Sequence, residues 1–176
     1  MKPVIDIAVE AEAWDSFEDA AALAETVIVQ TINQSGAKLA AETEISIVLC
    51  DDAFIADLNR KWRGVDKPTN VLSFPSGGPI AATPVLGDIV IAYETTEREA
   101  QEAGKPFRDH VAHLIAHGFL HLIGYDHIVG AEAEAMEALE RSVLARLGID
   151  DPYQQPLASL EEGLPPVEGP LTSVKE

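Results

Sequence analysis

The stretch that decides the fold reads His110-Val111-Ala112-His113-Leu114-Ile115-Ala116-His117-Gly118-Phe119-Leu120-His121-Leu122-Ile123-Gly124-Tyr125-Asp126-His127 and contains all five histidines of the chain. Its pattern predicts a helix from Phe107 to Leu122 that ends at Gly124. On a helix, His117 and His121 lie one turn apart, about 6 Å along the axis, and project from the same face. Gly124 permits a sharp turn, after which His127 can return as a third imidazole.

This His-x3-His-x5-His spacing predicts a metal site. Three neutral imidazoles suit a zinc-type ion and leave a fourth position for water, so we expect His117, His121 and His127 to hold one such ion. The spacing is also that of the metzincin peptidases. Peptidases with a His-Glu-x-x-His motif use the glutamate as general base, and Gly118 occupies that position here. Peptide hydrolysis would therefore lack its proton acceptor.

The other histidines are expected to support this site. His113 and His121 lie about 12 Å apart along the helix axis and cannot share an ion with His117 between them. We therefore assign His110 and His113 to packing or to hydrogen bonds around the ligands. Asp126 either orients a ligand imidazole or forms the turn, and both interpretations remain open.

Outward from this helix, strands and helices alternate early in the chain and helices gather late. We expect strands at residues 4–9, 45–49, 70–74 and 88–92, a loop at 76–84, and helices at 16–33, 53–62, 93–103 and 131–147. A capping box of Ser16 and Asp19 would begin the first helix, and Asp51 or Asp52 would cap the second. This order favours an α+β domain with a small, mostly parallel or mixed sheet.

Composition limits the classes of protein. The chain has 176 residues, and its 30 acidic and 12 basic side chains give a net charge of -18, which argues against binding nucleic acid by bulk attraction. Four of the basic residues nevertheless cluster: Arg60, Lys61, Arg63 and Lys67. A lone Cys50 excludes a disulfide scaffold and fits a reducing compartment. Asp6 precedes any long apolar run, so we expect no signal peptide, no membrane span and a cytoplasmic protein.

One folded domain is expected at 1–153. Residues 154–176 contain four of the eleven prolines and no aromatic side chain, so we expect a disordered C-terminal tail there.

The segment 117–127 closely resembles the histidine signature of the YbeY family of bacterial rRNA maturation factors, which are metal-dependent endoribonucleases. Matching stretches occur at 59–63, 66–75 and 86–91, and the resemblance runs from about residue 4 to residue 153. It implies an α+β fold with a four-stranded mixed sheet, zinc on the three histidines named above, and a functional arginine at Arg63. A planar guanidinium suits the charge that develops on phosphoryl oxygens. Lys61 and Lys67 are weaker candidates for phosphate contacts.

The resemblance also implies an activity and partners. These are single-strand-specific cleavage of RNA in 16S rRNA 3′-end maturation and ribosome quality control, with single-stranded rRNA, small-subunit ribosomal proteins and an assembly GTPase as partners, and without DNA or membranes. Ser73, Asp88 and Tyr125 lie in matching stretches, where strand packing and turn formation can account for them. The attacking group, water or the RNA 2′-hydroxyl, remains open.

Two other functions remain as alternatives. One is a metallohydrolase acting on peptides or small molecules, against which Gly118 counts. The other is a non-catalytic, zinc-containing ribosome assembly factor, in which the ion only closes a turn. A site with three protein ligands and an open position favours catalysis, because structural zinc sites usually have four.

Overall fold

The computed structural model describes residues 2–126 and 130–153. In chain order its elements are β1 (Val4–Val9), the 3-10 helix η1 (Glu12–Ser16), α1 (Ala20–Ser35), β2 (Glu44–Cys50), α2 (Asp52–Arg63), β3 (Val71–Pro75), the 3-10 helix η2 (Ile80–Ala82), β4 (Val85–Ala92), α3 (Tyr93–Ala103), α4 (Phe107–Leu122) and α5 (Gly130–Arg146). His127 and the expected tail at 154–176 lie outside the described residues. No helix among the described residues is long and apolar enough to cross a membrane.

The four strands form one mixed sheet in the order β1-β2-β4-β3. The pairs β1/β2 and β2/β4 are parallel, and β3 runs antiparallel to β4. The register places Ile47 of β2 between Ile7 and Ile89 on its two neighbours. This arrangement confirms the expected α+β fold with a four-stranded mixed sheet.

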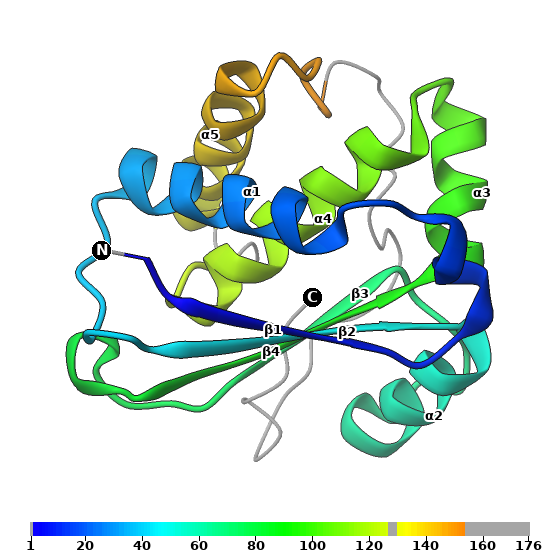
Figure 1. Ribbon diagram of the computed structural model, residues 1–176, viewed down its shortest axis with the longest axis horizontal. Coiled ribbons are helices and arrows are strands. Elements are labelled where there is room, and N and C mark those ends of the chain that lie inside the picture. The colour runs from blue at the N-terminus through cyan, green and yellow to red at the C-terminus, as the bar shows by residue number, and fades with distance from the viewer. Residues whose placement is uncertain (1, 127–129, 154–176) are drawn as a thin grey trace.

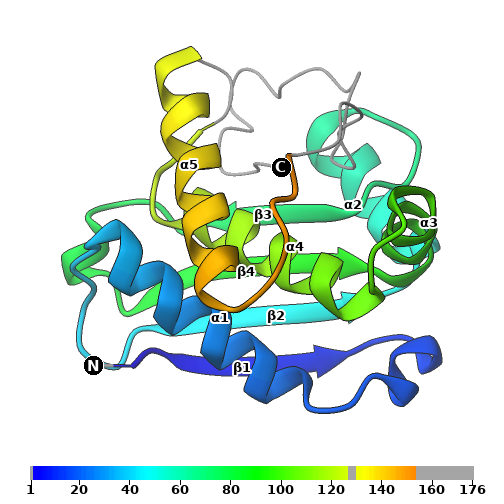
Figure 2. The same cartoon turned by 90° about the horizontal axis from the view of Figure 1, so that it is seen from above.

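Helices cover the two faces of the sheet unequally (Figure 1). Helices α1 and α4 pack over one face, and α5 packs on these two helices (Figure 2). Helix α2 lies against the opposite face, where Ile55 packs with Leu72 and Val90. Successive residues of β4 therefore point to opposite faces of the sheet. Val90 packs with α2, whereas Ile89 and Ile91 point into the larger core with α1 and α4.

Helix α4 is the central helix of the molecule, and every residue from His110 to Leu122 is buried. Its approach to the sheet depends on Gly118. A Cβ atom at this position would lie 2.8 Å from Ile89 Cγ2 and 3.1 Å from Ser73 Oγ, and the Ser73 hydroxyl donates to the Gly118 carbonyl at 3.1 Å. A glutamate at position 118 would be forced into the sheet, which explains in physical terms why a peptidase base is absent there.

One predicted helix start was wrong. Ser16 ends η1 and donates to the Ala13 carbonyl, and α1 begins only at Ala20, after Asp19 has taken a left-handed φ of 57°. The cause is tertiary. Trp14 is buried, donates to the Cys50 carbonyl and packs edge-on against Phe17, so the chain turns at this point instead of beginning the long helix.

The other elements agree with the prediction to within a few residues. Residues 93–103 and 107–122 form helices with the expected bounds, and Asp51 Oδ1 accepts from the Phe54 amide at 2.8 Å as the cap of α2. Strand β4 begins three residues earlier than expected, because Val85 pairs with Glu44 of β2. The predicted loop at 76–84 contains the short helix η2.

Candidate metal centre

Four histidines form a row along one face of α4, which we call the histidine row: His110, His113, His117 and His121. Their spacing of three or four residues keeps them on one side of the helix. Successive ring centroids lie 6.0, 6.2 and 4.7 Å apart, and the last and shortest distance joins the two predicted ligands. All four side chains are buried.

Glu140 of α5 fixes the proton of His117. Its fully buried carboxylate accepts from His117 Nδ1 at 3.1 Å, from His113 Nε2 at 2.5 Å and from the Tyr153 hydroxyl at 2.6 Å. Burial alone would raise the pKa of Glu140, but the two imidazoles outweigh this effect and hold it below its usual value. The carboxylate is therefore ionised and can only accept, which places the His117 proton on Nδ1.

The turn after α4 fixes the proton of His121. Gly124 takes a φ of 110° and its amide donates to the His121 carbonyl, which brings the Tyr125 carbonyl back to His121 Nδ1 at 2.8 Å. A carbonyl oxygen can only accept, so His121 also carries its proton on Nδ1. Tyr125, which lies in one of the stretches that match the family, thus contributes a backbone group.

These two histidines have the donor chemistry of metal ligands. With Nδ1 protonated, each ring presents the Nε2 lone pair for coordination. Metal-binding histidines characteristically donate their other N–H to a carboxylate or a carbonyl, as His117 and His121 do here. The pair therefore fits a zinc-type ion.

A second arrangement of ligands is also close enough to hold an ion. The ligand atoms of His113, His117 and Glu140 all lie within 4.8 Å of one another. The same three side chains are already joined by hydrogen bonds, and an ion held through the hydrogen-bonded nitrogens would require both imidazoles to move their protons to the opposite nitrogens. Burial lowers the pKa of His113 to about 4, so this ring is neutral and acts as a donor to Glu140. The full ligand set of His117, His121 and His127 stays a prediction.

The far end of the histidine row contacts a second carboxylate. His110 Nε2 lies 2.8 Å from Glu99 Oε1, which also accepts from Asn70 Nδ2 at 2.9 Å. Burial lowers the pKa of His110 to about 3 and raises that of Glu99 to about 7. Asn70 directly precedes β3, so this contact ties the sheet to α3 and α4.

Arg63 is the last residue of α2 and is half-buried. Its Nη1 donates to Asn59 Oδ1 at 3.2 Å, and the Asn59 amide donates to the Lys67 carbonyl at 2.9 Å. Asn59 therefore holds both the arginine and the loop that leads to Asn70. Lys67 itself is exposed, and so is Lys61, whose ammonium lies 5.3 Å from the centre of the Trp62 ring.

Sequence reasoning missed the two carboxylates of this site, Glu99 and Glu140. A signal for the second was present. Glu140 shares a buried stripe of α5 with Met136, Val143 and Leu144, and a carboxylate in an apolar stripe is costly unless it is paired. Its partners, however, lie on another helix and are not visible in the local pattern.

Comparison with known proteins identifies the family of the chain. The family model described as Endoribonuclease YbeY matches residues 8–148. A Methylocella silvestris protein named Endoribonuclease YbeY is 91% identical over 176 residues, covering all of both chains. A Rhodopseudomonas palustris protein of the same name is 51% identical over 159 residues, covering 86% of this chain and 90% of the relative. The solution structure of a Thermotoga maritima protein has the same fold, with a TM-score of 0.53 and 22% identity, and the match covers 82% of this chain and 92% of that one. The chain belongs to the YbeY endoribonuclease family.

Proposed function

We propose that the protein is a zinc-dependent endoribonuclease that cuts single-stranded RNA and acts in 16S rRNA 3′-end maturation and ribosome quality control. One observation carries the proposal. His117 and His121 present Nε2 lone pairs from adjacent turns of α4, while Glu140 and the Tyr125 carbonyl hold their Nδ1 protons. Relatives that share up to 91% of this sequence are named Endoribonuclease YbeY.

Each residue of the site has a role in this proposal. His117, His121 and His127 hold the ion, which when bound acts as a Lewis acid on the phosphodiester. Glu140 keeps the His117 ring in one tautomer and one orientation. The Arg63 guanidinium binds the phosphoryl oxygens and stabilises the negative charge that develops on them, and Asn59 orients it.

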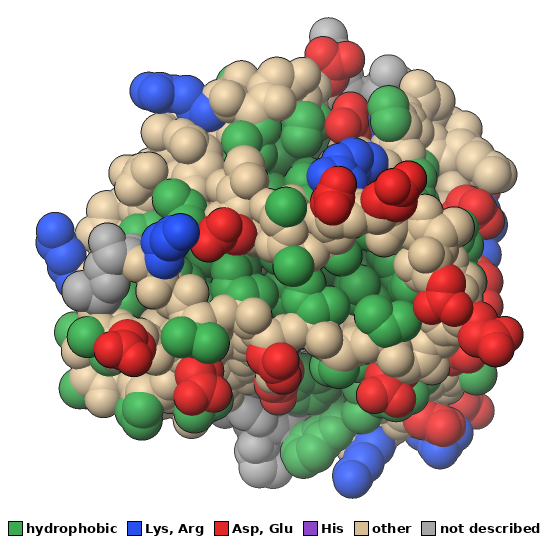
Figure 3. Space-filling model, viewed as in Figure 1, with side chains coloured by type: hydrophobic (Ala, Val, Ile, Leu, Met, Phe, Trp, Pro, Cys, Tyr) green, Lys and Arg blue, Asp and Glu red, His purple; other side chains and the backbone are tan. Residues whose placement is uncertain are grey.

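Charge restricts where RNA can approach. With a net charge of -18, most of the surface repels phosphate. Figure 3 shows acidic side chains scattered over the face with α1 and β1, where the basic side chains are isolated. The basic cluster Arg60, Lys61, Arg63 and Lys67 at the end of α2 and in the loop after it is therefore the favoured entry for the RNA backbone.

The remaining parts of the proposal concern the cellular setting. We place the enzyme in the cytoplasm, with single-stranded rRNA, small-subunit ribosomal proteins and an assembly GTPase as partners. The single, buried Cys50 is compatible with a reducing compartment.

The peptidase alternative loses support, because Gly118 is held against Ile89 and leaves no place for a general base.

The test is single-turnover cleavage of single-stranded and duplex RNA by the zinc-loaded wild type, Arg63→Lys, Arg63→Ala and a control, Arg60→Ala. Arg60 is exposed and paired with Asp57 at 3.0 Å, so its loss should weaken RNA affinity only, and less so at high salt. Both Arg63 variants should lose about 10² to 10³ in rate with their zinc content unchanged, because lysine lacks the planar set of donors.

Two results would overturn this function. The first is a wild-type protein that carries zinc and leaves single-stranded RNA intact. The second is a fully active Arg63→Lys variant, which would remove Arg63 from the catalytic groups. In the same reactions, analysis of the product ends distinguishes the attacking groups, because the 2′-hydroxyl gives a 2′,3′-cyclic phosphate and direct attack by water does not.

A further inference from the structure

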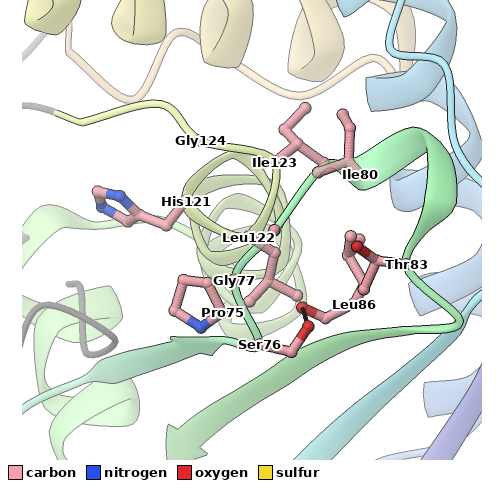
Figure 4. A pocket seen from close by; sticks show the side chains of 11 residues that line it. Pro75, Ser76, Gly77, Ile80, Thr83, Leu86, His121, Leu122, Ile123 and Gly124 are labelled. Carbon is pink, nitrogen blue, oxygen red and sulfur yellow. Dashed lines mark hydrogen bonds between the residues drawn. The ribbon is translucent and has the colours of Figure 1, made fainter.

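A cavity of about 340 Å³ lies beside His121, between the C-terminal end of α4 and the connection from β3 to β4 (Figure 4). Leu122 of α4 and Ile123 just after it line one side, Leu86 lines it from β4, and Ile80 faces them from η2. His121 forms one edge, so the cavity begins where the pair of metal-binding imidazoles ends. Neither the metal centre nor the basic cluster accounts for this space.

The sequence builds the cavity with glycines at two places. A Cβ atom on Gly87 would lie 2.3 Å from the Phe74 carbonyl oxygen and 2.9 Å from Leu122 Cδ2, so only glycine lets Leu122 reach the sheet and form a wall there. Gly77 and Gly78 turn the connecting loop with φ values of 88° and 83°, and a Cβ atom on Gly77 would meet nothing within 4 Å. The loop therefore arches around the space without filling it.

Two hydroxyl groups fix the loop and give the cavity its polar side. The Thr83 hydroxyl donates to the Pro79 carbonyl at 2.5 Å, and the Ser76 hydroxyl donates to the Val85 and Leu86 carbonyls. Because both protons are used, both oxygens offer lone pairs to a ligand. Apart from His121, none of the described residues that line the cavity is ionisable. The cavity thus suits a flat, uncharged ring with N–H donors on its edge, and does not suit a phosphate.

We propose that this cavity binds one unpaired nucleobase of the RNA, adjacent to the phosphate that is cleaved; the inference rests on the proposed function. A nucleobase has two apolar faces and N–H donors on its edge, and its phosphate lies one ribose away, at the metal centre. The cavity volume of about 340 Å³ is near the lower end of the roughly 300 to 1,000 Å³ typical of small-ligand sites. A cavity of this size admits one base and excludes a base pair. Only a base outside a duplex can enter it, which gives the enzyme a physical basis for preferring single strands.

The test combines a protein variant whose cavity is filled by a larger side chain with RNAs from which one base at a time has been removed. Ile80→Trp places an indole in the cavity, and Ala81→Trp adds the same side chain at the exposed neighbouring position as a matched control. Each zinc-loaded protein is given a single-stranded RNA with one cleavage site, either intact or with an abasic ribose at one position in turn. The readout is kcat/KM for cleavage.

The kcat/KM of the wild type should fall roughly tenfold or more when one position next to the cleaved bond is abasic, and much less when another position is abasic. The kcat/KM of Ile80→Trp should be lower by a similar factor on intact RNA and should fall no further on that abasic RNA. Ala81→Trp should behave as the wild type. A wild type indifferent to every abasic position would overturn the inference, and so would an Ile80→Trp variant with normal cleavage of intact RNA.

A milder variant guards against misfolding. Thr83→Val keeps the shape of the side chain and removes the hydroxyl group, with both its lone pairs and its hydrogen bond to the Pro79 carbonyl, so it should cleave intact RNA more slowly and match the wild type on the abasic RNA. Equal loss on both RNAs would contradict a role in base binding. Failure of the proposed function has a different result, because the wild type would then cleave none of these RNAs.

Discussion

Glutamine in place of Glu140 tests whether Glu140 prepares His117 for the proposed metal ion. The substitution keeps the volume of the side chain and changes one carboxylate oxygen into an N–H donor. The amide oxygen can still accept from His113 and Tyr153, which both bond to Oε1 in the wild type. The amide nitrogen then faces His117 Nδ1, where the wild type has Oε2 at 3.1 Å.

Two N–H donors cannot form a hydrogen bond with each other, so the glutamine amide drives His117 to move its proton from Nδ1 to Nε2, the nitrogen that should bind the metal. Replacing such a supporting group typically lowers metal affinity by about 10- to 100-fold, which is about 1.4 to 2.7 kcal/mol. We expect Glu140→Gln to fold and to bind zinc more weakly by this factor.

The assay is competition for zinc between the protein and a chelator of known affinity. Glu134→Gln, an exposed position on the same helix, is the control and should bind zinc as the wild type does. Wild-type affinity in a folded Glu140→Gln protein would refute the reasoning. A loss far above 100-fold would also contradict it, because Glu140 would then be a ligand, as in the His113, His117 and Glu140 arrangement.

Three further predictions test the surroundings of the site. Gly118→Ala should destabilise the fold by about 1 to 3 kcal/mol in urea denaturation, because its methyl group would lie 2.8 Å from Ile89. The control Gly130→Ala, whose methyl group would have nothing within 4 Å, should be neutral or slightly stabilising. Equal effects of the two substitutions would contradict the close packing of α4 on the sheet. Burial raises the pKa of Glu99 from 4.5 to about 7, so the folded state binds this proton more tightly than the unfolded state, and the contribution of Glu99 to stability should fall as the pH rises through that window, whereas the lowered pKa values of His110 and His113 act in the opposite direction. Glu99→Gln should remove up to about 3 kcal/mol of this fall, measured by denaturation at pH 5 and pH 8, and an unchanged slope would show that Glu99 is not the group responsible. His113→Leu should retain zinc binding to within about 100-fold, whereas His121→Leu should lose far more in the same chelator assay, and the reverse order would move the ion to the His113 side.

The sequence predicts well whatever depends on local spacing. The bounds of α3 and α4 follow from a strong helical pattern broken at Gly104-Lys105-Pro106. The juxtaposition of His117 and His121 follows from helix geometry alone, and the turn at Gly124 follows from the conformational freedom of glycine.

The sequence predicts poorly whatever depends on contacts between distant segments. Ser16 has the residues of a capping box around it, but burial of Trp14 against Phe17 decides the local conformation. Glu140 acquires its role only when α5 packs on α4. The cavity beside His121 requires the end of α4, the distant connection from β3 to β4 and the bare backbone of Gly87, and no local pattern shows that these parts come together.

The most direct test of the central claim is to titrate metal-free protein with zinc while measuring the cleavage of single-stranded RNA and the bound metal in the same samples. The account predicts that cleavage rises in proportion to bound zinc, reaches its maximum at one ion per chain, and is lost in His121→Ala together with the tight site. Full cleavage by protein that carries no metal, or cleavage that survives in His121→Ala, would contradict it.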